Sequence, residues 1–549
     1  MNYQYIFSIV GLLFVTSFFA QENTQHFSVG VESNSQYNMD DAVTGDFEED
    51  NRFRSNNYIK LGYDINDLSF GLQLESYAPQ AVLNYSPKFD SKINIGTASI
   101  AYNKKKWGVT LGHFYEQFGS GLVLRSWEDR QLGINNAILG GKLTFNPSDK
   151  IKMTALYGKQ RIGFAVSEGQ IFGVDTNFDL SSEDNSLNVG ASAVGRYQNI
   201  ASTNVDFNPI TYAFSGRTEY AKGNVFANIE GVLKTKDAIV ENQNILTQNL
   251  FYGNAVKLEL GYSKKGIGVV TTLRRLENMS FFSDREVAGN LYQEQIVNYV
   301  PALTKQQEYG LANMYVYTAQ PNISFSPKLK SGEIGGQIDF FYSFKKETAI
   351  GGKYGTKVNI NFANWYGLDA DYYSSSSFRR VNVNALNLGE QYLRDINLEI
   401  KKKLSKKTKI IFTYINSIYN KNYVEGYGDE IKYNILVADV KYKLSRKKSI
   451  RMDVQGLWTK QDKKDWAAAT LEFTPNTHFG FFVTDMYNYG NEHEDEKNHF
   501  FSLGGSYSKG RSRFALSYGR QRAGLLCVGG VCRYVPASTG LTFGLTTSL

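Results

Sequence analysis

Apolar and polar residues alternate one by one along many segments of this chain, and no other feature limits the fold as strongly. Residues 68–75 and 107–112 place apolar side chains at every second position, and residues 450–458 and 540–549 do so with one exception each, Gly456 and Thr547. A repeat of two is that of a β-strand, whose successive side chains point to opposite faces. The pattern extends over about nine to eleven residues, the length of a tilted strand that crosses a membrane.

The composition supports an all-β fold. The chain of 549 residues contains 50 Gly, 37 Tyr and 36 Phe, but only 9 Pro and 2 Cys. Aromatic residues suit a pleated sheet surface, and stretches rich in Ala, Leu and Glu are hard to find. The formal charge of +7 is modest for this length. It gives no reason to expect nucleic-acid binding.

An apolar run at residues 5–20 (YIFSIVGLLFVTSFFA) begins the chain. A helix that spans a bilayer needs about 20 residues, and this run is shorter. Small residues at Ser17 and Ala20 predict a signal peptide at 1–20, cleaved after Ala20. The segment before the run lacks Lys and Arg, so a retained anchor helix is the alternative. The apolar windows after residue 20 are too short for helical spans, which leaves a soluble secreted β protein or a membrane barrel.

Short and long strand connections alternate along the chain, as in outer-membrane barrels with short periplasmic turns and long external loops. Short connections are predicted at 64–67, 103–106, 146–149, 221–224, 264–266, 404–407, 445–448, 475–478 and 508–511. Long polar loops are predicted at 38–51, 78–92, 116–135, 234–249, 277–308 and 419–430. If the last strand ends in the periplasm and every short turn is periplasmic, each strand receives a direction. These directions alternate without conflict back to a first strand near residues 26–36.

The alternation of short and long connections predicts a single large antiparallel transmembrane β-barrel at 21–549. It has about 26 strands, in a range of about 24 to 26, and no plug domain. The segments 169–177 and 370–380 alternate poorly and are the weakest predicted strands. In hydrocarbon no water satisfies free backbone groups, so the last strand must pair with the first. The sequence therefore predicts one closed domain.

Aromatic residues recur beside the short turns. They are Tyr63, Tyr102, Trp107, Phe145, Tyr220, Tyr262, Tyr442, Phe473 and Tyr507. Amphipathic rings favour the headgroup level of a bilayer, so a row at one end of many strands indicates an interfacial girdle. The alternative is a set of ordinary strand-end aromatics in a soluble sandwich, whose apolar face packs on a second sheet. Together with the export signal, the pattern favours the barrel.

The most distinctive segment is YEQFGSGLVLRSWEDR at 115–130, in a predicted external loop. Its glycines permit sharp turns. Its charged residues are the candidate lumen or constriction residues, namely Glu116, Arg125, Glu128, Asp129 and Arg130. If the loop folds into the lumen, these charges could select or block solutes. The simpler interpretation is a self-neutralised loop whose ion pairs brace the barrel wall.

Three segments carry a family resemblance: LQLESYAPQAVL at 72–83, YEQFGSGLVLRSWEDRQLGINN at 115–136, and GLLCVGGVCRYVPASTGLTFGLTTSL at 524–549. They resemble an uncharacterised outer-membrane β-barrel family of the Bacteroidota, a domain of unknown function. The resemblance covers the whole mature chain. It implies a multi-pass β-barrel in the outer membrane of a Gram-negative cell. It implies no reaction or ligand, so no functional residue can be transferred.

The two cysteines, Cys527 and Cys532, fall in the last predicted external loop. An oxidising exported compartment favours a disulfide over two free thiols. Their spacing is not that of a redox CxxC motif, and two cysteines alone do not make a structural zinc site. Acidic clusters at 40–50 and 492–496 could hold Ca²⁺ or Mg²⁺, but neither has EF-hand spacing, so solvated loop charge is the preferred interpretation. No metal or cofactor is predicted.

Nothing in the sequence indicates catalysis. The five histidines are scattered, and no HExxH, GxSxG or Walker motif occurs. The sequence therefore predicts a porin-like channel or transporter of unknown substrate, with no catalytic residue. The alternative is a non-catalytic scaffold or accessory subunit of an outer-membrane secretion or assembly complex. Expected partners are outer-membrane lipid, lipopolysaccharide and other envelope proteins, and either inward-folded loops (116–135 and 277–308) or another protein would narrow the lumen.

Overall fold

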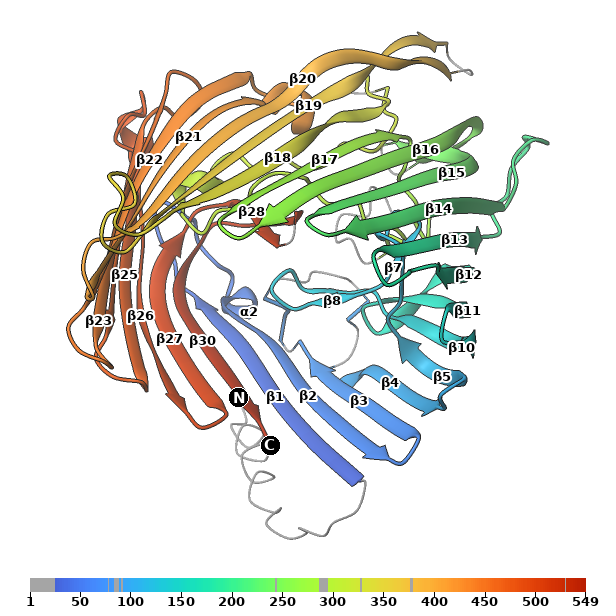
Figure 1. Ribbon diagram of the computed structural model, residues 1–549, viewed down its shortest axis with the longest axis horizontal. Helices are drawn as coiled ribbons and strands as arrows, with labels where there is room; N and C mark the ends of the chain where they lie inside the picture. The colour runs from blue at the N-terminus through green and yellow to red at the C-terminus, as the bar shows by residue number, and fades with distance from the viewer. Residues whose placement is uncertain are drawn as a thin grey trace.

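The computed structural model describes residues 25–77, 79–82, 88–89, 92–241, 244–285, 295–325, 328–375, 379–528 and 530–549. Its main feature is a closed, 24-stranded antiparallel sheet. Figure 1 shows the strands as a ring with loop segments inside it. The predicted signal peptide at 1–20 lies outside the described residues. Within them, no helix is long and apolar enough to cross a membrane.

The barrel strands follow one another in chain order. They are β1 (Gln25–Asn38), β2 (Phe53–Ile65), β3 (Leu68–Ser76), β4 (Asn94–Asn103), β5 (Trp107–Phe114), β10 (Ile138–Ser148), β11 (Ile151–Ile162), β12 (Ala165–Asp179), β13 (Ser186–Tyr197), β14 (Ile210–Lys222), β15 (Val225–Glu241), β16 (Asn244–Lys264), β17 (Ile267–Glu277), β18 (Gly332–Phe344), β19 (Thr356–Ser374), β20 (Arg379–Lys403), β21 (Thr408–Asn420), β22 (Glu430–Lys443), β23 (Ser449–Thr459), β24 (Trp466–Thr474), β25 (Phe479–Tyr487), β26 (His499–Lys509), β27 (Ser512–Gln521) and β30 (Ser538–Ser548).

Shorter elements lie in the connections. Three small hairpins are β6 (Gln117–Phe118) with β7 (Leu124–Arg125), β8 (Glu128–Asp129) with β9 (Ile134–Asn135), and β28 (Gly524–Val528) with β29 (Val531–Val535). The short helices are α2 (Glu49–Arg52), α3 (Lys421–Val424), η3 (Leu311–Asn313) and η4 (Glu494–Glu496).

The first and last strands close the ring, as predicted. β1 pairs with β30 from Gly30 opposite Ser548 to Asn38 opposite Gly540. Each barrel strand therefore has a partner on both sides, and the sheet has no free edge. Closure satisfies the backbone groups that lipid cannot satisfy.

The outer face of the barrel is apolar. On β16, Val256 and Leu260 are 48% and 44% exposed, whereas the neighbouring Ala255 points inward and is 1% exposed. Aromatic residues beside the short turns also point outward and are exposed, among them Trp107, Phe145, Tyr220, Tyr442 and Phe473. These outward, exposed rings stand at the positions that the predicted girdle requires. A closed barrel with an apolar outside supports a multi-pass β-barrel in the outer membrane.

The predicted turns are largely confirmed, but the strand count is lower than about 26. All nine predicted short connections join consecutive strands. The predicted loop at 234–249 is wrong, because β15 and β16 extend through it up to residues 241 and 244. The weak segment 169–177 lies within β12, whereas 370–380 covers the end of β19 and the start of β20. Strands such as β20, with 25 residues, are longer than one membrane crossing, so a segment such as 370–380, predicted as a strand, belongs to the ends of two longer strands.

Two connections fold into the barrel and form its core. We call residues 115–137 the β5–β10 loop and residues 278–331, as far as they are described, the β17–β18 loop. Apolar residues of both loops pack on inward-facing side chains from β5 to β17. A second cluster packs residues 302–317 of the β17–β18 loop on inward-facing side chains from β19 to β24. The loops therefore occupy the interior next to much of the wall.

Candidate functional site

The β5–β10 loop is fixed to the inner wall by its apolar residues. Phe118, Leu122, Val123 and Leu124 are all at most 2% exposed. Between them the chain turns at Gly121, whose φ of +93° is strained for other residues and which leaves only 3.1 Å between an added Cβ and Tyr299 Cβ. The glycines singled out in the sequence thus serve this inward fold.

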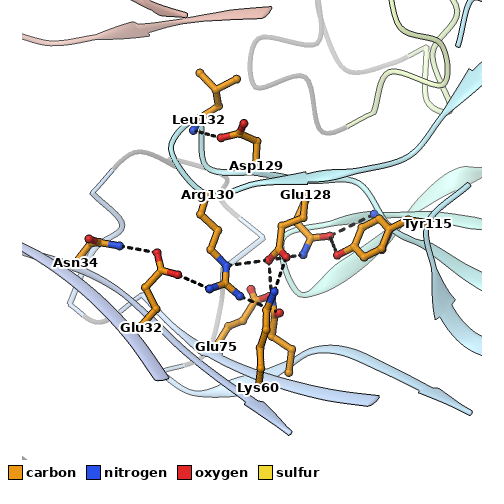
Figure 2. Close-up of polar contacts among 12 residues, drawn as sticks. Glu32, Asn34, Lys60, Glu75, Tyr115, Glu128, Asp129, Arg130 and Leu132 are labelled. Carbon is orange, nitrogen blue, oxygen red and sulfur yellow. Dashed lines mark hydrogen bonds and ion pairs between the residues drawn. The ribbon is translucent and has the colours of Figure 1, made fainter. Parts of the chain in front are cut away.

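Two of the predicted residues, Glu128 and Arg130, form one charged cluster with the wall (Figure 2). Arg130 Nε donates to Glu128 Oε1 at 3.3 Å, and its Nη1 and Nη2 donate to Glu32 on β1 and Gln73 on β3. Lys60 Nζ on β2 lies 3.0 Å from Glu128 Oε2. The loop is therefore tied to three consecutive strands through charged groups.

The electrostatics of this cluster favour the ionised forms. Burial alone would raise the pKa of Glu128, but Arg130, Gln73 and Lys60 outweigh burial and lower the pKa below its ordinary value. Burial alone would lower the pKa of Arg130, but Glu128 and Glu32 raise it. Both charges are therefore present at neutral pH.

Behind this cluster lies a fully buried ion pair. The guanidinium of Arg161 on β11 contacts both carboxylate oxygens of Glu75 on β3, at 2.5 and 3.1 Å. Tyr77 Oη and Gln73 Nε2 donate to the same carboxylate at 2.7 and 2.6 Å. The side chains of Arg161 and Glu75 are 3% and 0% exposed. Because the carboxylate is satisfied, this pair acts as a brace between β3 and β11.

Arg125 is in a different environment from the one its neighbouring carboxylates suggest. Within the described residues it makes no ion pair, and its guanidinium carbon lies 3.8 Å from the ring centre of Tyr299 and 4.8 Å from that of Trp127. Its backbone N–H donates to Val297 O at 2.8 Å. Arg125 therefore connects the two inward loops through cation–π contacts.

Glu116 and Asp129 each make local contacts. Glu116 Oε2 accepts from Lys142 Nζ on β10 at 3.0 Å. Asp129 Oδ1 accepts from the backbone N–H of Leu132 at 2.9 Å and stabilises the tight turn between β8 and β9. The five predicted residues thus share one inward loop, but contacts join only Glu128 and Arg130 directly.

The sequence reasoning missed a second buried cluster, which anchors the β17–β18 loop. Asp237 on β15 accepts from Arg196 Nη2 at 2.8 Å and from Arg285 Nε at 2.7 Å, the latter within the loop. Thr211 Oγ1 accepts from both guanidinium groups at 2.8 Å. The only sequence signal is a polar residue at an inward position of each strand.

A third anchor lies at the other end of the same loop. Glu333 on β18 accepts from Arg274 Nη2 at 2.6 Å. Tyr317 Oη and the backbone N–H of Gln320, both in the loop, donate to the other carboxylate oxygen at 2.5 and 2.7 Å. Tyr317 also stacks on Trp365 of β19. The β17–β18 loop is therefore held to the wall at two places, one on β13 to β15 and one on β17 to β19.

The disulfide hairpin is the third inward element. Cys527 and Cys532 are bonded, as predicted, at directly opposed positions of β28 and β29. The backbone N–H of Ala302 donates to Gly530 O at 2.9 Å. Val531 packs on Leu132 of the β5–β10 loop. The disulfide therefore fixes a hairpin that touches both inward loops (Figure 1).

A cavity of about 180 Å³ lies beside the β17–β18 loop. It is lined by this loop, by strands β20 to β22 and by the disulfide hairpin, through residues that include Gln307, Tyr315, Asp395, Asn397, Tyr433 and Cys532. A mixed lining of this kind suits a small polar solute or ordered water.

Residues of both acidic clusters make ion pairs with basic side chains. Asp41 pairs with Arg520 at 2.7 Å, and Glu496 pairs with Lys463 at 2.9 Å. Among the described residues, no group of three or more His, Cys, Asp or Glu side chains is arranged to hold a metal ion. The inward loops as a whole bring charged and hydrogen-bonding side chains into the barrel interior.

Among solved structures, the chain is similar to the siderophore receptor PirA from Pseudomonas aeruginosa, with 8% identity, a TM-score of 0.42, and coverage of 96% of this chain and 81% of that one. It is also similar to a BenF-like porin from Pseudomonas fluorescens Pf-5, with 7% identity, a TM-score of 0.34 and coverage of 86% and 99%. A third similar structure is the outer membrane protein opdK from Pseudomonas aeruginosa, with 8% identity, a TM-score of 0.36, and coverage of 83% of this chain and 98% of that one. A search of curated protein sequences gives no match.

The match to a sequence family is more extensive and spans residues 2–549. The chain belongs to the family of unknown function DUF6029.

Proposed function

We propose that this protein is a non-catalytic outer-membrane channel or transporter, with outer-membrane lipid and lipopolysaccharide as its surroundings. The observation that carries the proposal is the ionic anchoring of two long loops inside a 24-stranded barrel. A barrel of this size encloses a wide lumen, since diameter grows with strand number. Loops held there by charged groups reduce that lumen to a narrower, polar path.

The nature of the anchors supports a solute path. Charges that only braced a wall could be replaced by apolar contacts at little cost in stability. Here Glu128 and Arg130 remain 14% and 18% exposed, and Lys60 is 48% exposed. A partly solvated, charged lining at a constriction is the arrangement by which pores discriminate among solutes.

Purified protein reconstituted into planar bilayers tests the proposal. We expect stepwise ion conductance, and we expect Arg130→Ala to change its size or its fluctuations. The matched control is Arg511→Ala, which removes an exposed arginine from the turn between β26 and β27. Bilayers that stay silent at protein levels where a known porin conducts would contradict a channel role.

A scaffold role in an envelope complex is the second candidate, and one feature favours it. β19 and β20 have 19 and 25 residues and extend past a membrane crossing. On this extension Tyr373, Leu386 and Leu388 are 54%, 81% and 55% exposed. Apolar side chains gathered outside the bilayer mark a contact with another protein.

Co-purification in mild detergent distinguishes the two roles. A scaffold should retain envelope proteins, and Leu386→Ser with Leu388→Ser should release them. The control is Val205→Ser, which changes an apolar residue that is 97% exposed in the β13–β14 connection. A conducting protein that purifies alone would support the channel instead.

A further inference from the structure

A large recess at the short-turn end of strands β16 to β22 is lined mostly by lysines. Its volume is about 1150 Å³. The lysines are Lys264, Lys265, Lys345, Lys346, Lys357, Lys401, Lys402, Lys403, Lys406, Lys407, Lys409, Lys441 and Lys443. Among the described residues, the side chains that line it include no carboxylate. The recess therefore carries a high density of positive charge.

Side-chain alternation places six of the eight strand lysines on the lumenal face, whereas Lys264 and Lys402 fall on the opposite face. Lys401 and Lys403 share the face of Asn397, whose Oδ1 accepts from Gln307 of the β17–β18 loop at 2.9 Å. Lys441 shares the face of Asp439, which accepts from loop residue Tyr309 at 3.4 Å.

The lysines of β19 and β21 also face the lumen. Lys357 shares the face of Trp365, whose Nε1 donates to Leu303 O at 3.1 Å. On β21, Lys409 shares the face of Ile415, which packs in the interior cluster. The lysine ladder, as we call Lys357, Lys401, Lys403, Lys409, Lys441 and Lys443, therefore faces the interior and not the bilayer.

The ladder opposes like charges directly across strands. Lys357 is paired with Lys401, Lys403 with Lys409, and Lys409 with Lys441. Like charges directly opposite each other destabilise a sheet. With strands about 4.8 Å apart, the row from Lys403 to Lys441 spans roughly 10 Å. Such a row is stabilised when an anion lies against it.

Of two nearby carboxylates on the same face, Glu399 pairs with the ladder residue Lys401, and Asp439 pairs with an arginine outside the ladder. Glu399 lies 2.9 Å from Lys401 Nζ and 4.0 Å from Lys305 Nζ. Asp439 accepts from Arg451 Nη2 at 3.0 Å. Within the described residues, Lys357, Lys409, Lys441 and Lys443 make no ion pair, and Lys409 and Lys441 are exposed to the lumen. These four lysines are therefore available to an anion from outside the chain.

We propose that the lysine ladder is a binding site for small soluble solutes that carry several phosphate or carboxylate groups. This rests on the proposed function, because it names the class of solute that the channel would pass. Several ammonium groups along one row match a solute with several anionic groups better than a single monovalent anion. The inward direction of the ladder favours a dissolved solute over a lipid headgroup.

Equilibrium binding of inorganic tripolyphosphate to the purified full-length chain in phospholipid-free, uncharged detergent tests this proposal. Isothermal titration should show binding that weakens as salt increases. Lys409→Gln with Lys441→Gln should weaken it by about tenfold for each lysine removed. Lys409→Arg with Lys441→Arg keeps both charges and should preserve binding. An unchanged β-sheet circular dichroism spectrum of this variant would show that the barrel tolerates substitution at these two positions.

The control is Lys105→Gln with Lys106→Gln, which removes two exposed lysines from the turn between β4 and β5. Equal weakening by this control, or the absence of tripolyphosphate binding, would overturn the proposal. Binding of a polyglutamate peptide without tripolyphosphate binding would overturn it in favour of an acidic protein partner. Because titration needs no conductance, a silent bilayer with intact binding would contradict the channel role and leave this site standing.

Discussion

The guanidinium of Arg130 donates a hydrogen bond to the carboxylate of Glu32, at a distance of 2.5 Å between Nη1 and Oε2. Arg130 lies in the β5–β10 loop and Glu32 on the first strand, 98 residues earlier in the chain. This contact links the loop inside the barrel to the strand that closes it.

Arg130→Ala should loosen the loop and leave the carboxylates of Glu32 and Glu128 facing each other without their shared cation. Loss of charged hydrogen bonds in this partly buried place should cost about 2 kcal/mol of local stability. We expect faster proteolysis of the β5–β10 loop in detergent, measured by mass spectrometry of the fragments. Unchanged cleavage relative to Arg511→Ala would show that the contact does not hold the loop.

Glu75→Gln should be far more damaging, because it leaves the guanidinium of Arg161 buried without its counter-charge. Breaking a buried pair by removing one partner costs about 3–5 kcal/mol. The check is the urea midpoint of unfolding in detergent. Glu472→Gln, which removes a 42% exposed partner of Arg451, should change that midpoint little. Similar effects of the two substitutions would contradict the assigned burial.

Acidification should release the loop through Glu128. Its pKa in the folded protein lies below the ordinary value of 4.5, so its stabilising contribution is present above pH 4.5 and is lost as the pH falls through the lowered pKa. Single-channel current fluctuations should therefore increase in that acidic range. Glu128→Gln should show the larger fluctuations already at neutral pH and a weaker dependence on acid. An identical acid response in both proteins would assign the effect to other carboxylates.

Removing one charge from the lysine ladder should stabilise the barrel when no anion is bound. Lys409 lies directly opposite both Lys403 and Lys441, so Lys409→Gln relieves two like-charge contacts. The expected gain is about 0.2–1 kcal/mol for each contact, measured by urea unfolding at low salt. The gain should shrink at high salt, which screens the repulsion. A loss of stability at low salt would contradict the ladder's geometry.

Reducing the disulfide should affect the inward hairpin and not the barrel sheet. β28 and β29 form a separate two-stranded sheet. We expect dithiothreitol to expose residues 522–537 to protease while the temperature of barrel unfolding stays nearly unchanged. A large drop in that temperature would mean that the hairpin supports the wall.

The alternation of apolar and polar residues was sufficient to predict strands and short turns, because both depend on residues near one another in the chain. Ring closure joins β1 to β30 and was predictable because lipid offers the backbone groups of an edge strand no other partner. The strand count was overestimated because strands such as β16 and β20 continue beyond the bilayer, where alternation no longer marks their ends. The origin of the family in the Bacteroidota stays a prediction.

The candidate site was predictable only in part. Composition singled out the β5–β10 loop, but the partners of Glu128 on β2 and β3 precede it by 68 and 55 residues. Alternation shows that Lys60 and Gln73 face inward, but it does not show how far a loop reaches across the lumen. The lysine ladder had a signal in the runs at 401–403 and 406–407, which become one site only when four strands are aligned.

The most direct measurement is the single-channel conductance of the intact protein and of a variant in which residues 117–134 are replaced by a short Gly-Ser linker. If the inward loop narrows a continuous lumen, the intact protein conducts and the variant conducts several-fold more. Equal conductance of the two proteins, or silence of both when each is shown to be folded and inserted, would contradict the account.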